Sequence, residues 1–364
     1  CAFKDMALQI MPRLLSLALK KTGENRTAHI LVATSGDTGK AALEGYKDVE
    51  QVKITVFYPE DGVSRMQKLQ MATQEGENVR VYAIKGNFDD AQTGVKHIFA
   101  DSAFNDKLHE NGMFLSSANS INWGRLAPQI VYYVSAYCDL LKENDIALGE
   151  KVDVTVPTGN FGNIFAAYIA KRMGLPIGTL VCASNKNNIL TDFLNTGVYD
   201  RNRTFYTTMS PSMDILISSN LERLLYLIAG PEKTASYMKQ LSETGRYEVE
   251  KDVLDEIQKN FRAYFCDEEK CASTIRGMFR KYSYVLDPHT SVAVYAAERF
   301  ITDYQTGFKN IVASTASPYK FAADVMRSLD RDVTGLADKD VLEALSDYSK
   351  TEIPAPLASL FTKK

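Results

Sequence analysis

The sequence predicts an α/β protein in which open, parallel-type sheets are covered by helices. Short apolar runs of strand length alternate with longer runs of helical spacing along the whole chain. Several apolar runs lead directly into turns rich in glycine and hydroxyl residues, and a helical run follows each of these turns. Such turns lie at the carboxyl ends of parallel strands, where ligands bind. The pattern that predicts the fold therefore also predicts where the functional site is.

Composition limits the classes of function. With 364 residues, 45% of them hydrophobic, the chain is long enough for about two domains. A net charge of −3 and the lack of a basic stripe predict no nucleic-acid partner. No apolar run is long enough to span a membrane, and the cysteines form no CxxC pair. We therefore expect a cytoplasmic protein with no membrane partner. The histidines have no ligand spacing, so no metal site is predicted.

The first part of the chain alternates clearly between the two kinds of element. Gly23 marks the end of the first helix, Pro59 closes the second strand, and Asn87 or Asp89 would cap the fourth helix. Helices are expected at residues 1–21, 40–46, 64–76, 89–108 and 128–142, and strands at residues 29–33, 52–58, 79–84 and 114–117.

The rest of the chain repeats the alternation around two less regular segments. Residues 185–221 are expected to form an extended connection, and residues 231–282 a charged helical insertion. The apolar residues 284–286 lead into the turn 287–290, and the turn 315–320 also precedes a helix. Strands are expected at residues 152–157, 179–183 and 310–314, and helices at residues 164–173 and 291–304.

The turn at residues 158–163 has the composition of an anion-binding loop. Glycines let backbone N–H groups converge on a ligand, and the following helix adds about half a positive charge at its N-terminus. The expected ligand is a phosphate. The turn matches neither the GxGxxG fingerprint nor the GK[ST] loop. A tight connection without any ligand is an equally open alternative.

Two other turns carry many donors. Thr34, Ser35 and Thr38 suit a carboxylate, although Ser35 or Thr38 could instead cap the next helix. The turn at residues 118–125 contains Arg125, whose guanidinium can grip an oxyanion with two hydrogen bonds. Taken alone, an arginine on a solvated face is the simpler interpretation.

Two single residues have more than one interpretation. Lys4, which is flanked by apolar residues, could be an amine of lowered pKa in an apolar pocket or an ordinary surface charge. His289 lies in a turn on the expected ligand side, and a role in capping the next helix is favoured for it.

Taken together, these motifs resemble the threonine synthase family of pyridoxal-phosphate enzymes. The resemblance covers essentially the whole chain. It rests on seven motifs in the family's order: Ala2-Phe3-Lys4-Asp5, Ser35-Gly36-Asp37-Thr38-Gly39, Asn119-Ser120-Ile121-Asn122, Thr158-Gly159-Asn160-Phe161-Gly162-Asn163, Ser210-Pro211-Ser212-Met213-Asp214-Ile215, Asp287-Pro288-His289-Thr290 and Thr315. It implies fold type II, similar to tryptophan synthase β, with two open sheets covered by helices.

The resemblance also implies a role for each matching residue. Lys4 would bind pyridoxal 5'-phosphate and move protons at the substrate. Thr315 would contact the pyridine nitrogen. The cofactor phosphate would be held by Gly159, Asn160, Phe161, Gly162 and Asn163. The substrate carboxylate would be held by Thr34, Ser35, Asp37 and Thr38, and the substrate phosphate by Asn119, Ser120 and Arg125. Asp37 stands where many relatives carry Asn, so its side chain is expected to point away while backbone N–H groups bind.

The implied reaction converts O-phospho-L-homoserine and water to L-threonine and phosphate, with the protein as a monomer or homodimer. The alternatives are another fold type II lyase of the dehydratase kind and a homologue that binds the cofactor without turnover. The implied organisation is a helix with the catalytic lysine at residues 1–21, a small domain at 22–125 and a large domain at 126–364, with the insertion at about 230–283. Because residues that normally precede the lysine motif are absent, we expect a fragment that lacks an N-terminal domain.

Overall fold

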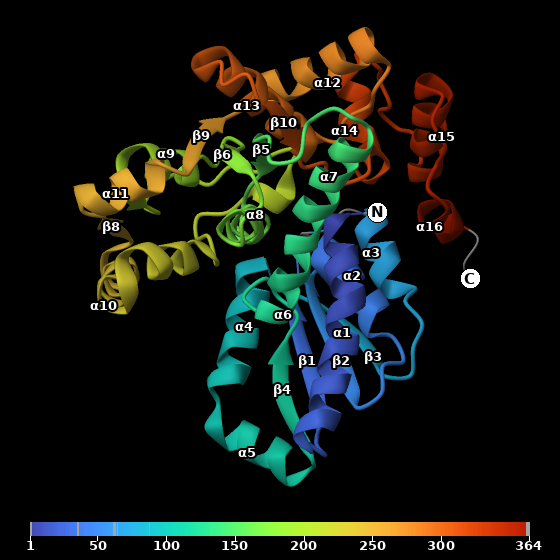
Figure 1. Cartoon of the computed structure of the whole chain (residues 1–364). Helices are drawn as coiled ribbons and strands as arrows, with labels where there is room; N and C mark the ends of the chain where they lie inside the picture. Colours follow the sequence, from blue (N-terminus) through green and yellow to red (C-terminus); the bar gives the residue numbers. More distant parts are fainter. Residues whose placement is uncertain (1, 35, 61–62, 64, 87, 362–364) are drawn as a thin grey trace. The chain divides into compact units, whose positions relative to one another are not determined.

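The computed structural model describes residues 2–34, 36–60, 63, 65–86 and 88–361, and it divides into two compact units (Figure 1). Unit 1 comprises Cys1–Pro128, Ala337–Glu343 and Glu352–Lys364, and unit 2 comprises Gln129–Leu336 and Ala344–Thr351. Residues 1–21 and 22–125, predicted as separate parts, thus belong to one unit. Unit 1 also takes in C-terminal segments that the sequence assigns to the large domain.

Unit 1 is built on a four-stranded parallel sheet in the order β3-β2-β1-β4. The strands are β1 (Thr27–Ala33), β2 (Val52–Pro59), β3 (Val79–Ile84) and β4 (Met113–Ser117). β1 pairs with β2 and β4, so its apolar side chains, among them Ile30 and Val32, are fully buried. This central position explains why β1 is a continuous apolar run and not an alternating one.

The helices of unit 1 follow the predicted order with one correction. The predicted helix at 89–108 is two helices, because Asp101 interrupts it and its carboxylate accepts a hydrogen bond from Phe104 N. The helices are α1 (Phe3–Thr22), α2 (Asp37–Tyr46), α3 (Arg65–Ala72), α4 (Phe88–Ala100), α5 (Ser102–Glu110), α6 (Trp123–Leu126) and α16 (Ala355–Ala358), with short 3-10 turns η1 (Ala127–Gln129) and η4 (Ser359–Phe361) at the ends of segments.

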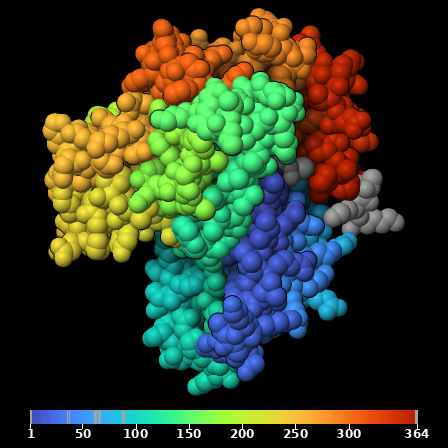
Figure 2. All heavy atoms as spheres, in the orientation of Figure 1, coloured from blue at the N-terminus to red at the C-terminus, as the bar shows by residue number. Residues whose placement is uncertain are grey.

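Helix α1 is apolar on two sides. One side carries Leu8 and Met11, which are buried in the core against α2 and the sheet. The other side carries Ile10 and Leu17, which are 49% and 64% exposed. The N-terminal part of the chain forms the blue surface in Figure 2. Gly23 ends the helix in the left-handed conformation, as predicted.

Unit 2 contains the second four-stranded parallel sheet, in the order β10-β5-β6-β9. A separate antiparallel pair, β7 (Val198–Asp200) with β8 (Arg246–Glu248), lies outside this sheet. The main strands are β5 (Val152–Pro157), β6 (Ile177–Ser184), β9 (Phe261–Phe265) and β10 (Lys309–Val312). Two parallel sheets confirm the predicted fold class.

Helices pack along the strands of this sheet and give unit 2 its core. In α13, Ala293, Ala296, Ala297 and Phe300 are buried at helical spacing, and the helix contacts all four strands. The helices are α7 (Ile130–Lys142), α8 (Gly162–Arg172), α9 (Ile189–Thr196), α10 (Leu221–Thr244), α11 (Lys251–Gln258), α12 (Glu268–Tyr282), α13 (Pro288–Tyr304) and α14 (Ala322–Ser328), with 3-10 turns η2 (Pro211–Met213) and η3 (Pro318–Phe321). The residues of a further helix, α15 (Asp338–Ser349), are divided between the two units.

Two predictions for this unit are wrong in part. The connection at 185–221 contains α9, β7 and η2, and the insertion at 230–283 contains β8 and β9 as well as helices. β9 is the edge strand of the main sheet, so this segment is part of the fold's framework. Residues 284–286 form no strand. Among the described residues, none of the helices combines the length and apolar content that crossing a membrane requires.

Candidate active site

In unit 1, two of the predicted turns follow neighbouring strands. The turn at residues 34–39 comes after β1, and the turn at 118–125 comes after β4. Because β1 and β4 are paired and parallel, both turns lie at the carboxyl edge of the first sheet. Unit 1 therefore brings the predicted carboxylate turn and the predicted arginine turn to the same edge.

Thr34 uses its hydroxyl inside the turn. Thr34 Oγ1 accepts hydrogen bonds from Gly36 N and Gly39 N, both at 2.9 Å, and the side chain is buried. The oxygen therefore shapes the turn, and two N–H groups that the sequence offers to a ligand are bound internally. Ser35 and the side chain of Asp37 lie outside the described residues, and Thr38 is half-buried at the start of α2.

Arg125 is buried, which contradicts the simpler interpretation of a solvated arginine. Its side chain is 4% exposed, and Nη1 donates to Ala118 O at 2.9 Å. Asn122 begins the short helix α6 by accepting from Gly124 N. Ser120 is half-buried, and Asn119 Oδ1 is a buried acceptor without a partner among the described residues. This turn thus combines a buried cation with an unsatisfied buried oxygen.

Lys4 lies in the first turn of α1, in unit 1. The side chain is half-buried, and Nζ is 5.9 Å from the centroid of the Phe3 ring. Asp5 Oδ2 accepts from Ala2 N, so the lysine is held on an ordered helical start.

In unit 2, the turn after β5 leaves a row of backbone donors unused. In the described part of the chain, the N–H groups of residues 159–164 donate to no other group. They precede or open helix α8, whose first N–H groups cannot bond within the helix. Consecutive unpaired N–H groups at a helix N-terminus form an anion site. This geometry fits the predicted phosphate loop.

Oxygen atoms of the same turn accept hydrogen bonds from other parts of unit 2. Gly159 O accepts from Ser218 Oγ at 2.8 Å, and Asn160 O accepts from Asn220 Nδ2 at 2.9 Å. Asn163 Oδ1 accepts from the buried Tyr133 hydroxyl at 2.6 Å. Burial raises the pKa of Tyr133, so its hydroxyl keeps the proton that it donates. Two carbonyl groups of the turn are thus bonded within the protein, whereas its N–H groups are not bonded among the described residues.

Two residues show that this turn is constrained. Phe161 is buried and has a left-handed backbone, with φ +61°, which is rare for a residue other than glycine. Gly159 lies against the neighbouring turn, because a Cβ on it would be 2.7 Å from Ser212 O. A side chain at position 159 would therefore force the two turns apart.

Thr315 follows the strand next to β5. β10 pairs with β5, so Thr315 and the 158–163 turn lie at the same edge of the second sheet. Thr315 is buried and donates its N–H to Thr290 Oγ1 at 3.3 Å. Its own hydroxyl has no partner among the described residues, which leaves it available to a ligand.

Comparison with known proteins agrees with this geometry. The family described as "Pyridoxal-phosphate dependent enzyme" matches residues 1–315, and "Threonine synthase, C-terminal" matches residues 290–364. Threonine synthase from Saccharomyces cerevisiae is 39% identical over 94% of this chain and 69% of that protein. The chain belongs to the threonine synthase family.

The relatives include proteins with a less definite name. Threonine synthase-like 1 from Homo sapiens is 44% identical over 90% of this chain, and the chain spans 44% of that protein's length. The crystal structure of threonine synthase with bound pyridoxal phosphate from Brucella melitensis has a TM-score of 0.86 at 38% identity, covering 100% of this chain and 71% of that one. This likeness confirms fold type II and pyridoxal phosphate as the family's cofactor.

The residues of unit 2 fit the cofactor of the threonine synthase family. The row of unused N–H groups suits its phosphate, and the hydroxyl of Thr315 suits its ring nitrogen. The two lie at the ends of neighbouring strands of one sheet. Lys4, Thr34, Thr38 and Arg125 belong to unit 1, so unit 2 brings together only the cofactor-binding part of the predicted site.

Sequence reasoning missed the residues that hold the phosphate turn from behind. Tyr133, Ser218 and Asn220 lie 30 to 60 residues from the turn along the chain. Tyr199 belongs to the same support, since its hydroxyl accepts from Ser218 N at 2.9 Å, and burial raises its pKa to about 12. No local motif marks these residues, and only the abundance of Asn, Thr and Ser in residues 185–221 pointed to this region.

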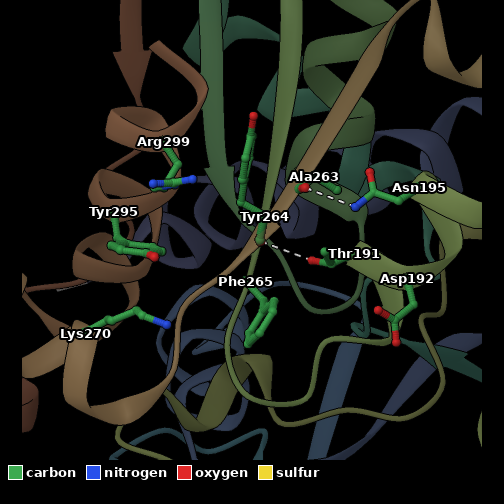
Figure 3. A pocket seen from close by; sticks show the side chains of 9 residues that line it. All are labelled: Thr191, Asp192, Asn195, Ala263, Tyr264, Phe265, Lys270, Tyr295 and Arg299. Atoms are coloured by element: carbon green, nitrogen blue, oxygen red, sulfur yellow. Dashed lines mark hydrogen bonds between the residues drawn. The ribbon is translucent and has the colours of Figure 1, made fainter. Parts of the chain in front are cut away.

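A pocket of about 390 Å³ lies elsewhere in unit 2, beside β9 (Figure 3). It contains none of the predicted site residues. Its charged side chains have protein partners: Lys270 pairs with Asp267 at 2.8 Å, and Asp192 pairs with Arg203 at 2.7 Å. Such satisfied groups favour a structural role for the pocket wall.

Proposed function

We propose that this protein is a threonine synthase that converts O-phospho-L-homoserine and water to L-threonine and phosphate. The observation that carries the proposal is the pairing of β1 with β4, which places a hydroxyl-rich turn and the turn of Arg125 on neighbouring strand ends. A substrate with a carboxylate at one end and a phosphate at the other needs two such anion-binding turns. A dehydratase substrate has no phosphate and needs one.

The residues of this chain would have the following roles. The N–H groups of residues 159–163 bind the cofactor phosphate, and the Thr315 hydroxyl meets the ring nitrogen. The turn at 34–39 binds the substrate carboxylate, through Thr38 and the backbone, while Thr34 keeps the turn in shape. Asn119, Ser120 and Arg125 bind the substrate phosphate. Lys4 Nζ holds the cofactor and moves protons at Cα and Cβ. The bound cofactor ring supplies the electron sink for this chemistry.

A second candidate is a phosphate-eliminating lyase of the same fold type that does not form threonine. The relatives that are 44% identical are named threonine synthase-like 1, not threonine synthase. The two functions use the same cofactor site and differ in the fate of the carbon chain. The products distinguish them, since the first yields L-threonine and the second a 2-oxo acid.

The test is an assay of phosphate release and of both carbon products from O-phosphohomoserine with added pyridoxal phosphate. We expect Lys4→Ala to lose roughly 10²–10⁴-fold in rate, the usual contribution of a general acid–base group. Lys20→Ala is the matched control, because Lys20 lies on the same helix in an exposed pair with Glu50. Turnover by Lys4→Ala at the parent rate would refute the role of Lys4.

The carboxylate turn has its own test. Asp37→Asn should lower the KM for O-phosphohomoserine, because it removes a negative charge from the turn that binds the substrate carboxylate, even with the side chain pointing away. If the KM and kcat of Asp37→Asn equal those of the parent, Asp37 has no special role in substrate binding.

A further inference from the structure

A buried aspartate–histidine pair occupies the start of helix α13. Asp287 Oδ1 accepts from His289 N at 2.9 Å and from Thr290 N, which caps the helix. The His289 imidazole is also next to this carboxylate, with Nδ1 3.1 Å from Oδ1, and both side chains are 5% or less exposed. The cap needs only the backbone N–H groups, so it does not explain why an imidazole is buried here.

The other nitrogen of His289 reaches the turn that supports the phosphate loop. His289 Nε2 accepts a hydrogen bond from Ser212 N at 3.2 Å. Because Nε2 is an acceptor, Nδ1 carries the proton and donates it to Asp287. Ser212 belongs to η2, and its carbonyl oxygen is the atom closest to where a Cβ of Gly159 would lie. The imidazole therefore holds η2 against the phosphate loop.

The carboxylate connects in the opposite direction to Thr315. Thr290 Oγ1 donates to Asp287 Oδ2, and the same hydroxyl oxygen accepts from Thr315 N at 3.3 Å. Thr290 is buried, and its hydroxyl also lies 3.5 Å from Ser314 Oγ, so all of its neighbours belong to unit 2. The Asp287 carboxylate thus acts on Ser212 through His289 and on Thr315 through Thr290.

We propose that Asp287 and His289 form a positioning unit that sets the separation between the phosphate loop and Thr315. One arm runs through His289 and Ser212 to Gly159, and the other runs through Thr290 to Thr315. The unit holds both ends of the pyridoxal ring site in register. The inference rests on the proposed roles of residues 159–163 and Thr315, and all of its members belong to unit 2.

The two arms can be separated by comparing two ligands, pyridoxal 5'-phosphate and pyridoxal without its phosphate. The measurement is the dissociation constant of each ligand for the full chain freed of cofactor, followed by absorbance. His289→Asn keeps a donor toward Asp287 and removes the acceptor for Ser212 N. We expect it to weaken binding of the phosphorylated ligand about tenfold, since a buried N–H loses its partner, and to leave pyridoxal binding unchanged.

Three further variants isolate the connections. His289→Gln extends an oxygen toward Ser212 N and should bind pyridoxal 5'-phosphate more tightly than His289→Asn does. Thr290→Val cuts the arm to Thr315 and should weaken both ligands by a similar factor, because both contain the ring. Thr290→Ser keeps the hydroxyl and should restore binding. His29→Gln is a matched control, because His29 bonds to the Thr55 hydroxyl at 2.9 Å within the sheet of unit 1.

Each outcome has a distinct meaning. If His289→Asn melts at a lower temperature yet keeps the parent's preference for the phosphorylated ligand, His289 is merely structural and the proposal is overturned. Should His289→Asn not fold, weakening of both ligands by Thr290→Val with rescue by Thr290→Ser supports the proposal, and unchanged binding by Thr290→Val refutes it. A parent protein without preference between the two ligands would instead refute the proposed role of residues 159–163.

Discussion

The turns after β1 and β5 have the same order of strand, turn and helix, yet they use their backbone N–H groups in opposite ways. In the turn after β1, a side chain of the turn itself, Thr34, accepts from Gly36 N and Gly39 N. In the turn after β5, no described group accepts from residues 159–164, and distant side chains hold the carbonyls instead.

This difference shows that the number of donors in a turn does not measure its capacity for a ligand. The turn at 34–39 has more hydroxyls, but its threonine is used to close the turn. The turn at 158–163 has fewer hydroxyls, but its oxygen atoms are bonded by the side chains of Ser218, Asn220 and Tyr133. A turn that is shaped from outside keeps its own N–H groups for an anion.

The largest expected effect comes from removing the internal acceptor of the first turn. Thr34→Val leaves the N–H groups of Gly36 and Gly39 buried without an acceptor, which costs about 2–4 kcal/mol of unfolding free energy. Urea denaturation measures this loss. Thr34→Ser keeps the oxygen and should lose far less. If Thr34→Val is as stable as Thr34→Ser, the turn does not depend on this oxygen.

The next effect comes from adding a methyl group to the second turn. In Gly159→Ala the new Cβ would lie 2.7 Å from Ser212 O. Such overpacking costs about 1–3 kcal/mol. Because it displaces the loop that binds the phosphate, we expect weaker binding of pyridoxal phosphate. The matched variant is Gly36→Ala, which strains a backbone at φ +136° and should reduce stability with little change in cofactor affinity. Equal effects of both variants on cofactor affinity would remove the contrast between the turns.

A smaller effect is expected from the outside support. Ser218→Ala removes the donor to Gly159 O, a loss of about 1 kcal/mol that corresponds to roughly fivefold weaker cofactor binding. Ser273→Ala is the control, since its hydroxyl also donates to a backbone carbonyl, that of Lys270, but at an exposed position. Cofactor binding by Ser218→Ala at the parent affinity would mean that the loop holds its shape without this support.

The smallest effect concerns the strands themselves. In β1, the pKa of His29 is lowered by burial and by the Lys53 ammonium. In β5, the polar side chain is the buried Asp153, which accepts a hydrogen bond from Thr179 N at 2.7 Å. A lowered pKa means that the folded chain binds fewer protons, so stability present above pH 6.5 falls as the pH drops below it. Denaturation between pH 7 and pH 5 should show a shallower decline for His29→Gln. If the decline in stability is the same in His29→Gln as in the parent, other titrating groups cause it.

Local patterns were sufficient to predict most of the framework. β3 has the predicted bounds, because its apolar run is closed by Gly86, and α1 ends at the predicted glycine. The break at Asp101 was missed because the apolar spacing continues across it, although the residue is a good helix cap. β9 was missed because five residues within a charged helical region carry too short a signal of their own.

Part of the candidate site could likewise be predicted from local patterns, and part could not. The glycines and hydroxyls that face a ligand lie in short motifs and can be identified from the sequence. The side chains that make those motifs functional, such as Ser218 and Asn220, bond across about 60 residues and leave no local pattern. The burial of Arg125 and the internal use of Thr34 depend on packing, which spacing alone does not specify.

The edge strand β9 has a consequence for the solubility of the chain. The side chains of α9 donate to two of its carbonyls: Asn195 Nδ2 to Ala263 O, and Thr191 Oγ1 to Tyr264 O (Figure 3). An uncovered edge is a template on which another polypeptide can add a strand. The short helix α9 thus covers part of β9, and we expect its fraying under heat or mild denaturant to increase the exposure of the edge to neighbouring molecules.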